Sequence, residues 1–272
     1  MAAAVTTIAT TKPLRFVKNQ KCFKHGDTII PGLLKLLQSR FFPTYSYTNA
    51  KHNLDHHGKT EYRRRLNKKK KSTRAIGVDL GMALDRHVTA TVDILTRFPE
   101  APFSVFYDMT CAKLSPLPAQ DKNVIQSTLP QTRAFWKAME ALKLRPIATQ
   151  VPVMRTYKTH RYATAVDVVC TNHLGEHVLI ENKSGFTGYY HNCTKDRMHS
   201  PLHALTDSLA NQHQLQLAAT REMYQQHFPQ HTLGTCLIMH IEGSKVSVYP
   251  LKAWALSVQS WAQLLFEKQS PN

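Results

Sequence analysis

An aspartate and a short acidic-x-basic tripeptide are the residues of this sequence best placed to do chemistry. Asp167 and, 14 residues later, Glu181, Asn182 and Lys183 lie inside or directly after runs of apolar, β-branched residues that predict strands. Side chains alternate along a strand, so Glu181 and Lys183 should point to the same face. The turn predicted at 172–177 makes the two strands antiparallel neighbours, and we therefore expect Asp167 to lie beside Glu181.

Two carboxylates at such a short separation predict a bound cation. They repel each other unless a positive charge lies between them, and their oxygen atoms suit Mg²⁺ or Mn²⁺ rather than zinc. A lysine alongside can orient a water molecule or stabilise the charge that develops on a phosphate. These residues therefore predict cleavage of a phosphodiester bond. The competing hypothesis is a purely structural ion pair, Glu181–Lys183 or Asp167–Lys183, because a buried charge needs a partner.

The elements that must position these residues follow from periodicity and from turn residues. The expected helices lie near 79–95 and at 131–144, 206–228 and 252–268. The expected strands lie at 147–155, 161–171, 177–184, 233–241 and 245–251, with a further short strand near 103–107 in a region of loops. From residue 131 onward the order is helix, three strands, helix, two strands, helix.

The pattern of residues and elements resembles the PD-(D/E)XK nuclease superfamily. The resemblance implies an α/β fold with a restriction-endonuclease-like core, αβββαβ, in which helices flank a mixed central sheet. It also implies that Asp167 and Glu181 bind the divalent metal and that the backbone carbonyl of Asn182 is a further ligand. Lys183 would assist the attacking water.

A glutamine on the following helix is similar to the RecB-like exonuclease branch of this superfamily. Gln214 stands at the best-matching place in 211-NQHQLQLA-218, with Gln216 as the second choice. On that resemblance Gln214 joins Asp167, Glu181 and Lys183 in the predicted catalytic set, where it would orient the lysine or the substrate. The tyrosine that the branch has four residues later is replaced by Ala218. Within the branch, the layout from residue 147 is similar to that of the mitochondrial genome maintenance exonucleases.

Two positions depart from the branch. Gln150 stands where an acidic residue is common, and Gly81 stands where a histidine is common, with Asp85 or His87 as substitutes nearby. These departures leave the number of metal ions open. They also leave open a degenerate nuclease that binds nucleic acid without cleaving it.

The net charge of the 272-residue chain, +17, is concentrated at its start. Residues 1–74 hold 17 basic and 3 acidic residues, and the densest run is 63-RRRLNKKKKSTR-74. We expect residues 1–74 to be a largely disordered extension and residues 75–272 to be the nuclease domain. The run suits nuclear import, contact with nucleic acid, or a solvated linker.

The start of the chain also bears on its location. The first 26 residues contain no acidic residue, which is compatible with a mitochondrial transit peptide. No apolar run approaches about 18 residues and no long apolar segment suits a secretion signal. We therefore expect the mitochondrion or the nucleus, with no membrane partner.

The function predicted from the sequence is a metal-dependent DNA nuclease, an exonuclease on single-stranded or flapped DNA. The alternatives are the degenerate nucleic-acid-binding protein and an endonuclease that cuts duplex DNA. Three further groups of residues have two interpretations each. The loop with Tyr189, Tyr190 and His191 either stacks an unpaired base or packs its own aromatic rings. The turn with Arg155, Lys158, His160 and Arg161 either binds the phosphate backbone or is only solvated, and Phe135 and Trp136 either form a ligand platform or belong to the core.

Overall fold

The protein is a mixed α/β fold in which helices cover a mixed central sheet. The computed structural model describes residues 14–17, 22–42, 81, 83–84, 87–89, 92, 94, 129–184, 190, 193–257 and 260–267. The helices are α1 (Leu33–Phe41), α7 (Leu129–Ala141), α8 (Leu209–His227), α9 (Ala253–Leu256) and α10 (Trp261–Phe266). The strands are β1 (Leu14–Val17), β2 (Cys22–His25), β3 (Thr28–Ile30), β4 (Arg145–Tyr157), β5 (His160–Thr171), β6 (His177–Ser184), β7 (Cys193–Arg197), β8 (Thr206–Ser208), β9 (Leu237–Glu242) and β10 (Lys245–Pro250).

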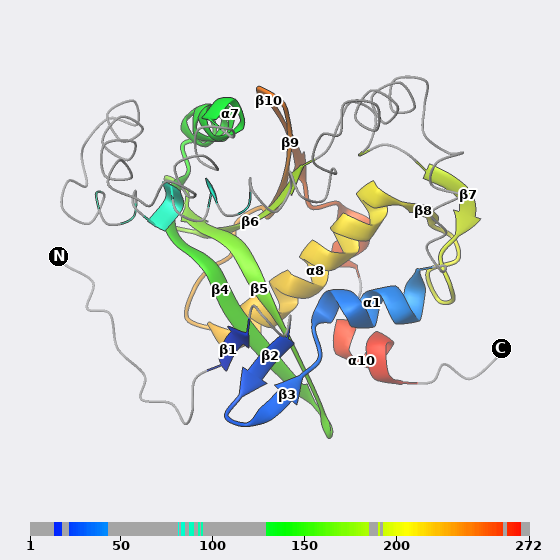
Figure 1. Ribbon diagram of the computed structural model, residues 1–272. Helices are drawn as coiled ribbons and strands as arrows, with labels where there is room; N and C mark the ends of the chain where they lie inside the picture. The colour runs from blue at the N-terminus through cyan, green and yellow to red at the C-terminus, as the bar shows by residue number, and fades with distance from the viewer. Residues whose placement is uncertain are drawn as a thin grey trace, which may run out of the picture.

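The central sheet has five strands in the order β10-β9-β6-β5-β4. Strands β4, β5 and β6 form an antiparallel meander, whereas β6 and β9 run parallel, and β10 returns antiparallel to β9. A parallel pair needs a crossover connection, and α8 lies within it (Figure 1). The predicted order of helix, three strands, helix and two strands is confirmed for α7, α8 and the strands of the central sheet, and a separate two-stranded sheet, β7-β8, is inserted between β6 and α8.

The turn between β5 and β6 fixes the register of the two strands that carry the candidate site. Gly175 has a positive φ of 76°, a conformation that glycine adopts without a steric cost. Asn172 Oδ1 accepts hydrogen bonds from the backbone N–H groups of Leu174 and Glu176, at 2.9 and 3.0 Å. Register matters because a slip of one residue would move every side chain to the opposite face.

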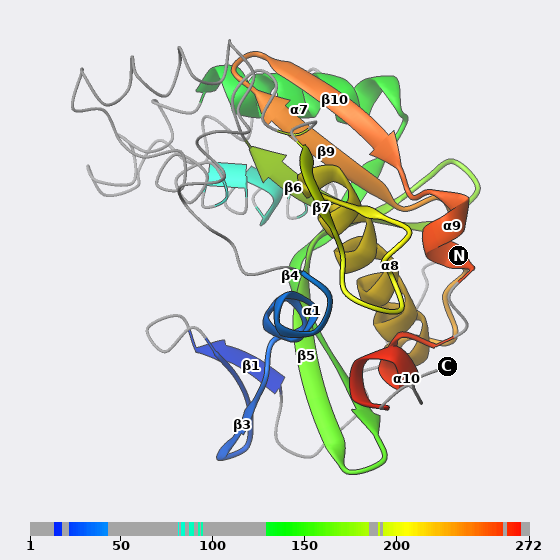
Figure 2. The same ribbon diagram turned by 90° about the vertical axis from the view of Figure 1, so that its right-hand side faces the viewer.

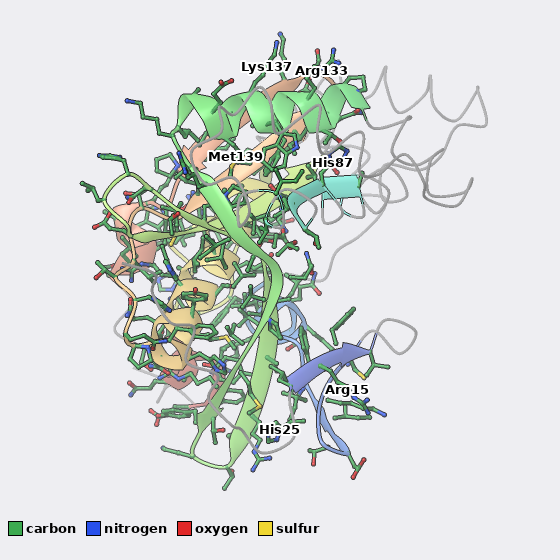
Figure 3. The ribbon with its side chains drawn as sticks, turned by 90° about the vertical axis from the view of Figure 1, so that its left-hand side faces the viewer. Arg15, His25, His87, Arg133, Lys137 and Met139 are labelled. Carbon is green, nitrogen blue, oxygen red and sulfur yellow. The ribbon has the colours of Figure 1, made fainter. Side chains whose placement is uncertain are left out.

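The strands bury alternate residues on two faces of the sheet. Val168, Ile180 and Met239 pack in the same cluster as α7, and Val169, Leu179 and Ile238 pack in the cluster that contains α8 and α1. On α7, Phe135 and Trp136 are buried, which confirms their reading as core residues. Figure 3 shows Arg133 and Lys137 on the outer side of α7, where both are exposed, whereas Met139 is buried.

The expectation of a largely disordered extension over 1–74 is wrong for residues 14–17 and 22–42. These residues form a small sheet, β1-β2-β3, and helix α1, which lie against the long β4–β5 hairpin (Figure 2). Leu33, Leu37 and Phe41 are at most 1% exposed and share a core cluster with α8. The folded unit therefore includes residues before the expected boundary at 74/75. The basic run at 63–74 lies outside the described residues.

Other differences from the predicted elements are local. The first residues of the helix expected at 206–228 form β8, and Ser208 caps α8 by accepting a hydrogen bond from the Asn211 N–H at 3.2 Å. The helix expected at 252–268 is divided into α9 and α10. Within 79–95 the described residues are helical, and the strand expected near 103–107 lies outside the described residues. Among the helices of the described ranges, none is long and apolar enough to cross a membrane.

Candidate active site

The candidate site forms where strands β5 and β6 separate. Their backbone pairing runs from Thr171–His177 to Val168–Ile180, and Asp167 and Glu181 are the next residues on each strand. Beyond this point the backbone N–H of Asn182 donates instead to Asp167 Oδ2, at 2.9 Å. The aspartate carboxylate thus replaces the backbone acceptor that the departing strand no longer supplies, and it holds the two acidic residues side by side.

Glu181 is at the centre of a buried polar network. It is 3% exposed, and its Oε1 accepts hydrogen bonds from Lys183 Nζ at 2.5 Å and from Gln216 Nε2 at 2.7 Å. Gln216 Oε1 in turn accepts from Lys183 Nζ at 3.3 Å. The prediction that Glu181 and Lys183 share a face is confirmed. The predicted ion pair of Glu181 with Lys183 is also present, so this pairing by itself does not separate a structural role from a catalytic one.

A pocket of about 250 Å³ opens beside the two carboxylates. Its lining residues come from β4, β5, β6 and the helical residues Gly81 and Leu84. They are Gly81, Leu84, Thr149, Gln150, Asp167, Val168, Glu181, Asn182, Lys183 and Ser184. Both positions that depart from the RecB-like branch, Gln150 and Gly81, therefore lie at this pocket. A Cβ atom placed on Gly81 would have no atom within 4 Å.

Asp167 is half-buried, and its surroundings raise the pKa of its carboxyl group to about 7. Burial is the larger cause and the charge of Glu181 is the second. Lys183, the N–H of Asn182 and the amide of Gln150 lower this pKa but do not cancel the effect. Gln150 Nε2 donates to Asp167 Oδ1 at 3.3 Å, so each oxygen of the carboxylate has one donor.

The oxygen atoms at the pocket fit a hard divalent cation. Glu181 Oε2 accepts no hydrogen bond from any described residue, and each Asp167 oxygen retains a lone pair after its one hydrogen bond. Asn182 Oδ1 is buried with no hydrogen-bond partner among the described residues. No cluster of three or more His, Cys, Asp or Glu side chains suited to a metal occurs within the described residues. The carboxylate oxygens of Asp167 and Glu181 are therefore the donors available at the pocket, and carboxylate oxygens suit Mg²⁺ or Mn²⁺.

Gln214, the first choice for the catalytic glutamine, does not reach this network. Its Nε2 donates to the carbonyl of Pro250 at 3.1 Å, and its Oε1 accepts from the N–H of Lys252 at 2.8 Å. It therefore joins α8 to the end of β10 and does not contact Lys183, so the expectation that it orients the lysine is wrong, whereas its alternative role of orienting the substrate stays a prediction. Gln216, the second choice, is the glutamine that contacts both Glu181 and Lys183.

The remaining sequence candidates have mostly structural positions. Tyr190 is 3% exposed and stacks on Tyr249 with ring centroids 4.5 Å apart, so it packs within the protein. His87 is fully buried and does not line the pocket, and burial lowers its pKa to about 4. Tyr189, His191 and Asp85 lie outside the described residues.

The basic residues near the β4–β5 turn belong to two different environments. Arg155 pairs with Glu222 of α8, and both side chains are largely buried, so Arg155 is part of the packing between β4 and α8. Lys158 pairs with Glu267 at 2.7 Å, and both atoms lie at the surface. His160 stacks on Phe266 with ring centroids 4.6 Å apart, and Arg161 is exposed. Of these basic residues, only the exposed ones, Lys158, His160 and Arg161, are accessible to a phosphate.

Sequence reasoning missed a cluster of rings next to Lys183. His240 on β9 is paired with Lys183 in the parallel ladder, and Tyr190 packs against His213 of α8, His240 and Tyr249. Burial, followed by the charge of Lys183 and by His240, keeps the pKa of His213 well below its usual range. The lowered pKa favours the neutral form of the His213 ring beside Lys183. No sequence spacing links these four residues, because they come from separate elements.

Comparisons with known proteins assign no family. No protein-family model matches the chain, and no curated protein matches it. Among solved structures, the chain is similar to the crystal structure of SSO0001, at 13% sequence identity and a TM-score of 0.29, over 70% of this chain and 76% of that chain. This likeness is too low to support an argument about activity.

Replacing Asp167 with Asn should stabilise the metal-free protein at neutral pH. The raised pKa means that the folded state keeps its proton between about pH 4 and pH 7 while the unfolded state loses it, so wild-type stability falls as pH rises through this window. The Asn side chain is neutral throughout, and the Gln150 amide can turn over to bond it. We expect a gain of up to about 4 kcal/mol at pH 8 and almost none at pH 4.

This expectation is checked by thermal unfolding in EDTA across pH 4–8. A difference in Tm between Asp167→Asn and wild type that does not change with pH would contradict it. Adding Mn²⁺ at pH 8 should raise the Tm of the wild type and leave that of the variant unchanged.

Replacing Gln214 with Leu should lower stability without affecting metal binding. The change leaves the Pro250 carbonyl and the Lys252 N–H without their partner, at a cost of about 1–3 kcal/mol in the free energy of unfolding. Denaturant unfolding measures this cost. Gln226→Leu, an exposed position on the same helix, serves as the control and should change stability by less than about 0.5 kcal/mol. If Gln214→Leu left the stability unchanged but abolished the rise in Tm that Mn²⁺ causes, Gln214 would belong to the active site after all.

Proposed function

We propose that this protein is a metal-dependent DNA nuclease with a PD-(D/E)XK core, an exonuclease that acts on single-stranded or flapped DNA. The observation that carries the proposal is the position of Asp167, Glu181 and Lys183 at one pocket, where two neighbouring strands separate. The element order and the antiparallel β4-β5-β6 meander followed by parallel β9 support it, because the resemblance implies this core. Participation in DNA maintenance, replication or repair belongs to the same proposal.

Asp167 and Glu181 would hold the cation, through the carboxylate oxygens that have no or only one hydrogen-bond donor. The backbone carbonyl of Asn182 is a further ligand on the resemblance. A bound Mg²⁺ or Mn²⁺ supplies a Lewis acid that stabilises negative charge on the scissile phosphate and on the leaving oxygen.

Lys183 would position the water that attacks the phosphorus atom. Its ammonium group donates hydrogen bonds to Glu181 Oε1 and Gln216 Oε1 and lines the pocket beside the two carboxylates. Gln216 acts through Lys183, because its amide bonds Glu181 at one end and the lysine at the other. The pair of acceptors fixes the lysine in place, so that little reorganisation is needed when charge develops on the phosphate.

The second candidate function is a degenerate nuclease that binds nucleic acid without cleaving it. Gln150 supports this alternative, because an amide and not a carboxylate faces Asp167. The open space beside Gly81 supports it as well, because no side chain at this position extends over the pocket. The Glu181–Lys183 ion pair is compatible with both functions.

A cleavage assay with and without free ends separates these functions. Wild-type protein with Mg²⁺ or Mn²⁺ should degrade end-labelled single-stranded DNA, and Lys183→Ala and Lys183→Met should reduce the rate about 100-fold or more. Lys245→Ala removes an exposed lysine from β10 and should leave the rate unchanged. Circular dichroism verifies that each variant is folded.

The outcomes of this assay are distinct. Equal background rates for the wild type and both Lys183 variants would eliminate the enzyme and favour the nucleic-acid-binding function. Cleavage of a closed single-stranded circle, which has no free ends, would show that the protein is an endonuclease and not an exonuclease.

Neutralising the basic run at 63–74 should weaken DNA binding and flatten its salt dependence. Each phosphate contact that is lost should lower the slope of log K against log salt by roughly 0.7 on single strands. Deleting residues 1–74 is unsuitable, because α1 belongs to the core. Fluorescence anisotropy of a labelled 20-nucleotide strand measures the slope for the wild type, for the Lys/Arg→Gln variant and for Lys183→Met as a control. An unchanged slope would assign the run to targeting, to the nucleus or the mitochondrion, or to a linker.

A further inference from the structure

The carboxylate oxygens of Asp167 and Glu181 at the pocket are sufficient for one cation. On Glu181, Oε1 already accepts from Lys183 and Gln216, and Oε2 accepts from no described residue. On Asp167, the Gln150 amide and the Asn182 N–H each occupy one lone pair of one oxygen. One cation bound by Oε2 of Glu181 and by the remaining lone pairs of Asp167 would occupy all of these acceptor sites. A second cation bound by carboxylates would have to share the same oxygen atoms.

The net charge of the residues that line the pocket also favours one bound cation. Among the described lining residues, Asp167 and Glu181 are the acidic groups and Lys183 is the basic one, a sum of −1 when all three are ionised. One divalent ion changes this sum to +1, which the phosphate of a substrate can balance. Two divalent ions would change it to +3, and their mutual repulsion is four times that of two unit charges at the same distance.

Gln150 occupies the place from which a further carboxylate would face a second ion. It lines the pocket on β4, opposite Asp167, and its Nε2 lies 3.3 Å from Asp167 Oδ1. Its φ is +49°, in the left-handed region that a residue with a side chain adopts at a cost in energy. A left-handed residue within a strand interrupts the regular alternation of side chains, and here it coincides with the residue whose amide meets Asp167.

We infer that the site takes one divalent cation, held by Asp167 and Glu181, and that Gln150 is a positioning residue that orients Asp167 for this single ion. The inference rests on the proposed function. It assigns Gln150 a role that an amide performs and a carboxylate does not: the amide donates a hydrogen bond to Asp167 and adds no charge. Replacing it with a carboxylate should create the negative charge that a second ion requires.

Isothermal titration with Mn²⁺, together with electron paramagnetic resonance of free Mn²⁺, tests the inference without any activity measurement. Wild type should bind one equivalent. Gln150→Glu should bind a second equivalent, or bind the first at least tenfold more tightly. Gln150→Met keeps the size of the side chain but cannot donate to Asp167, and it should still bind one equivalent at about three- to tenfold lower affinity.

Gln226→Glu is the matched control, since it adds the same charge at an exposed position on α8, ten residues and roughly 15 Å along the helix from Gln216. It should change neither the affinity nor the number of ions. Circular dichroism establishes that the Gln150 variants are folded.

Two equivalents bound by the wild type would overturn the inference and leave the proposed function standing. Unchanged binding in both Gln150 variants would overturn the positioning role. The absence of any Mn²⁺ binding by the wild type would overturn the proposed nuclease, and the inference with it.

Discussion

The separation of β5 from β6 is the constraint on which the candidate site depends. Once the strands part, the N–H of Asn182 needs a new acceptor, and the carboxylate of Asp167 provides it. This bond holds Asp167 next to Glu181, although burial and like charge both oppose the ionised pair. The hydrophobic clusters on the two faces of the central sheet stabilise the fold and so offset the cost of burying the two carboxylates together. A cation is the partner that would turn the cost into an attraction.

The strands that carry the site were predictable because their signals are local. Runs of β-branched residues marked β5 and β6, and a glycine turn of the right length made them antiparallel neighbours. The two-residue spacing of Glu181 and Lys183 then required a shared face. The β-strand period and one turn were therefore enough to bring the three residues to one pocket. The hydrogen bonds that hold Glu181 and Lys183 also involve Gln216 of α8, and no local sequence pattern predicts where α8 packs on the sheet.

The choice between Gln214 and Gln216 shows where sequence reasoning fails. The side chains of two residues that are two positions apart on a helix point in directions about 200° apart, so only one of the two glutamines can face Lys183. A polar residue normally marks the exposed side of a helix, but α8 is buried on all sides from Gln214 to Thr220. Both glutamines are therefore buried and bonded, one to β10 and one to the site. The N-terminal elements were missed because the prediction applied the excess positive charge of residues 1–74, which is densest at 63–74, to the whole segment, although Leu33, Leu37 and Phe41 form a helical stripe within it.

The residues that depart from the expected pattern occupy a different part of the pocket from those that retain it. Glu181 and Lys183 lie on β6, which is hydrogen-bonded to β9 along this stretch, and Asp167 is tied to β6 through Asn182. Gln150 lies on the edge strand β4, and Gly81 lies on a separate helical segment. The interior strand pair fixes the acidic residues and the lysine, whereas the outer wall carries an amide and an open space. Because an edge strand and a flanking helix can change without disturbing the sheet register, the outer wall is the part of this site that can change while the two carboxylates and the lysine keep their places.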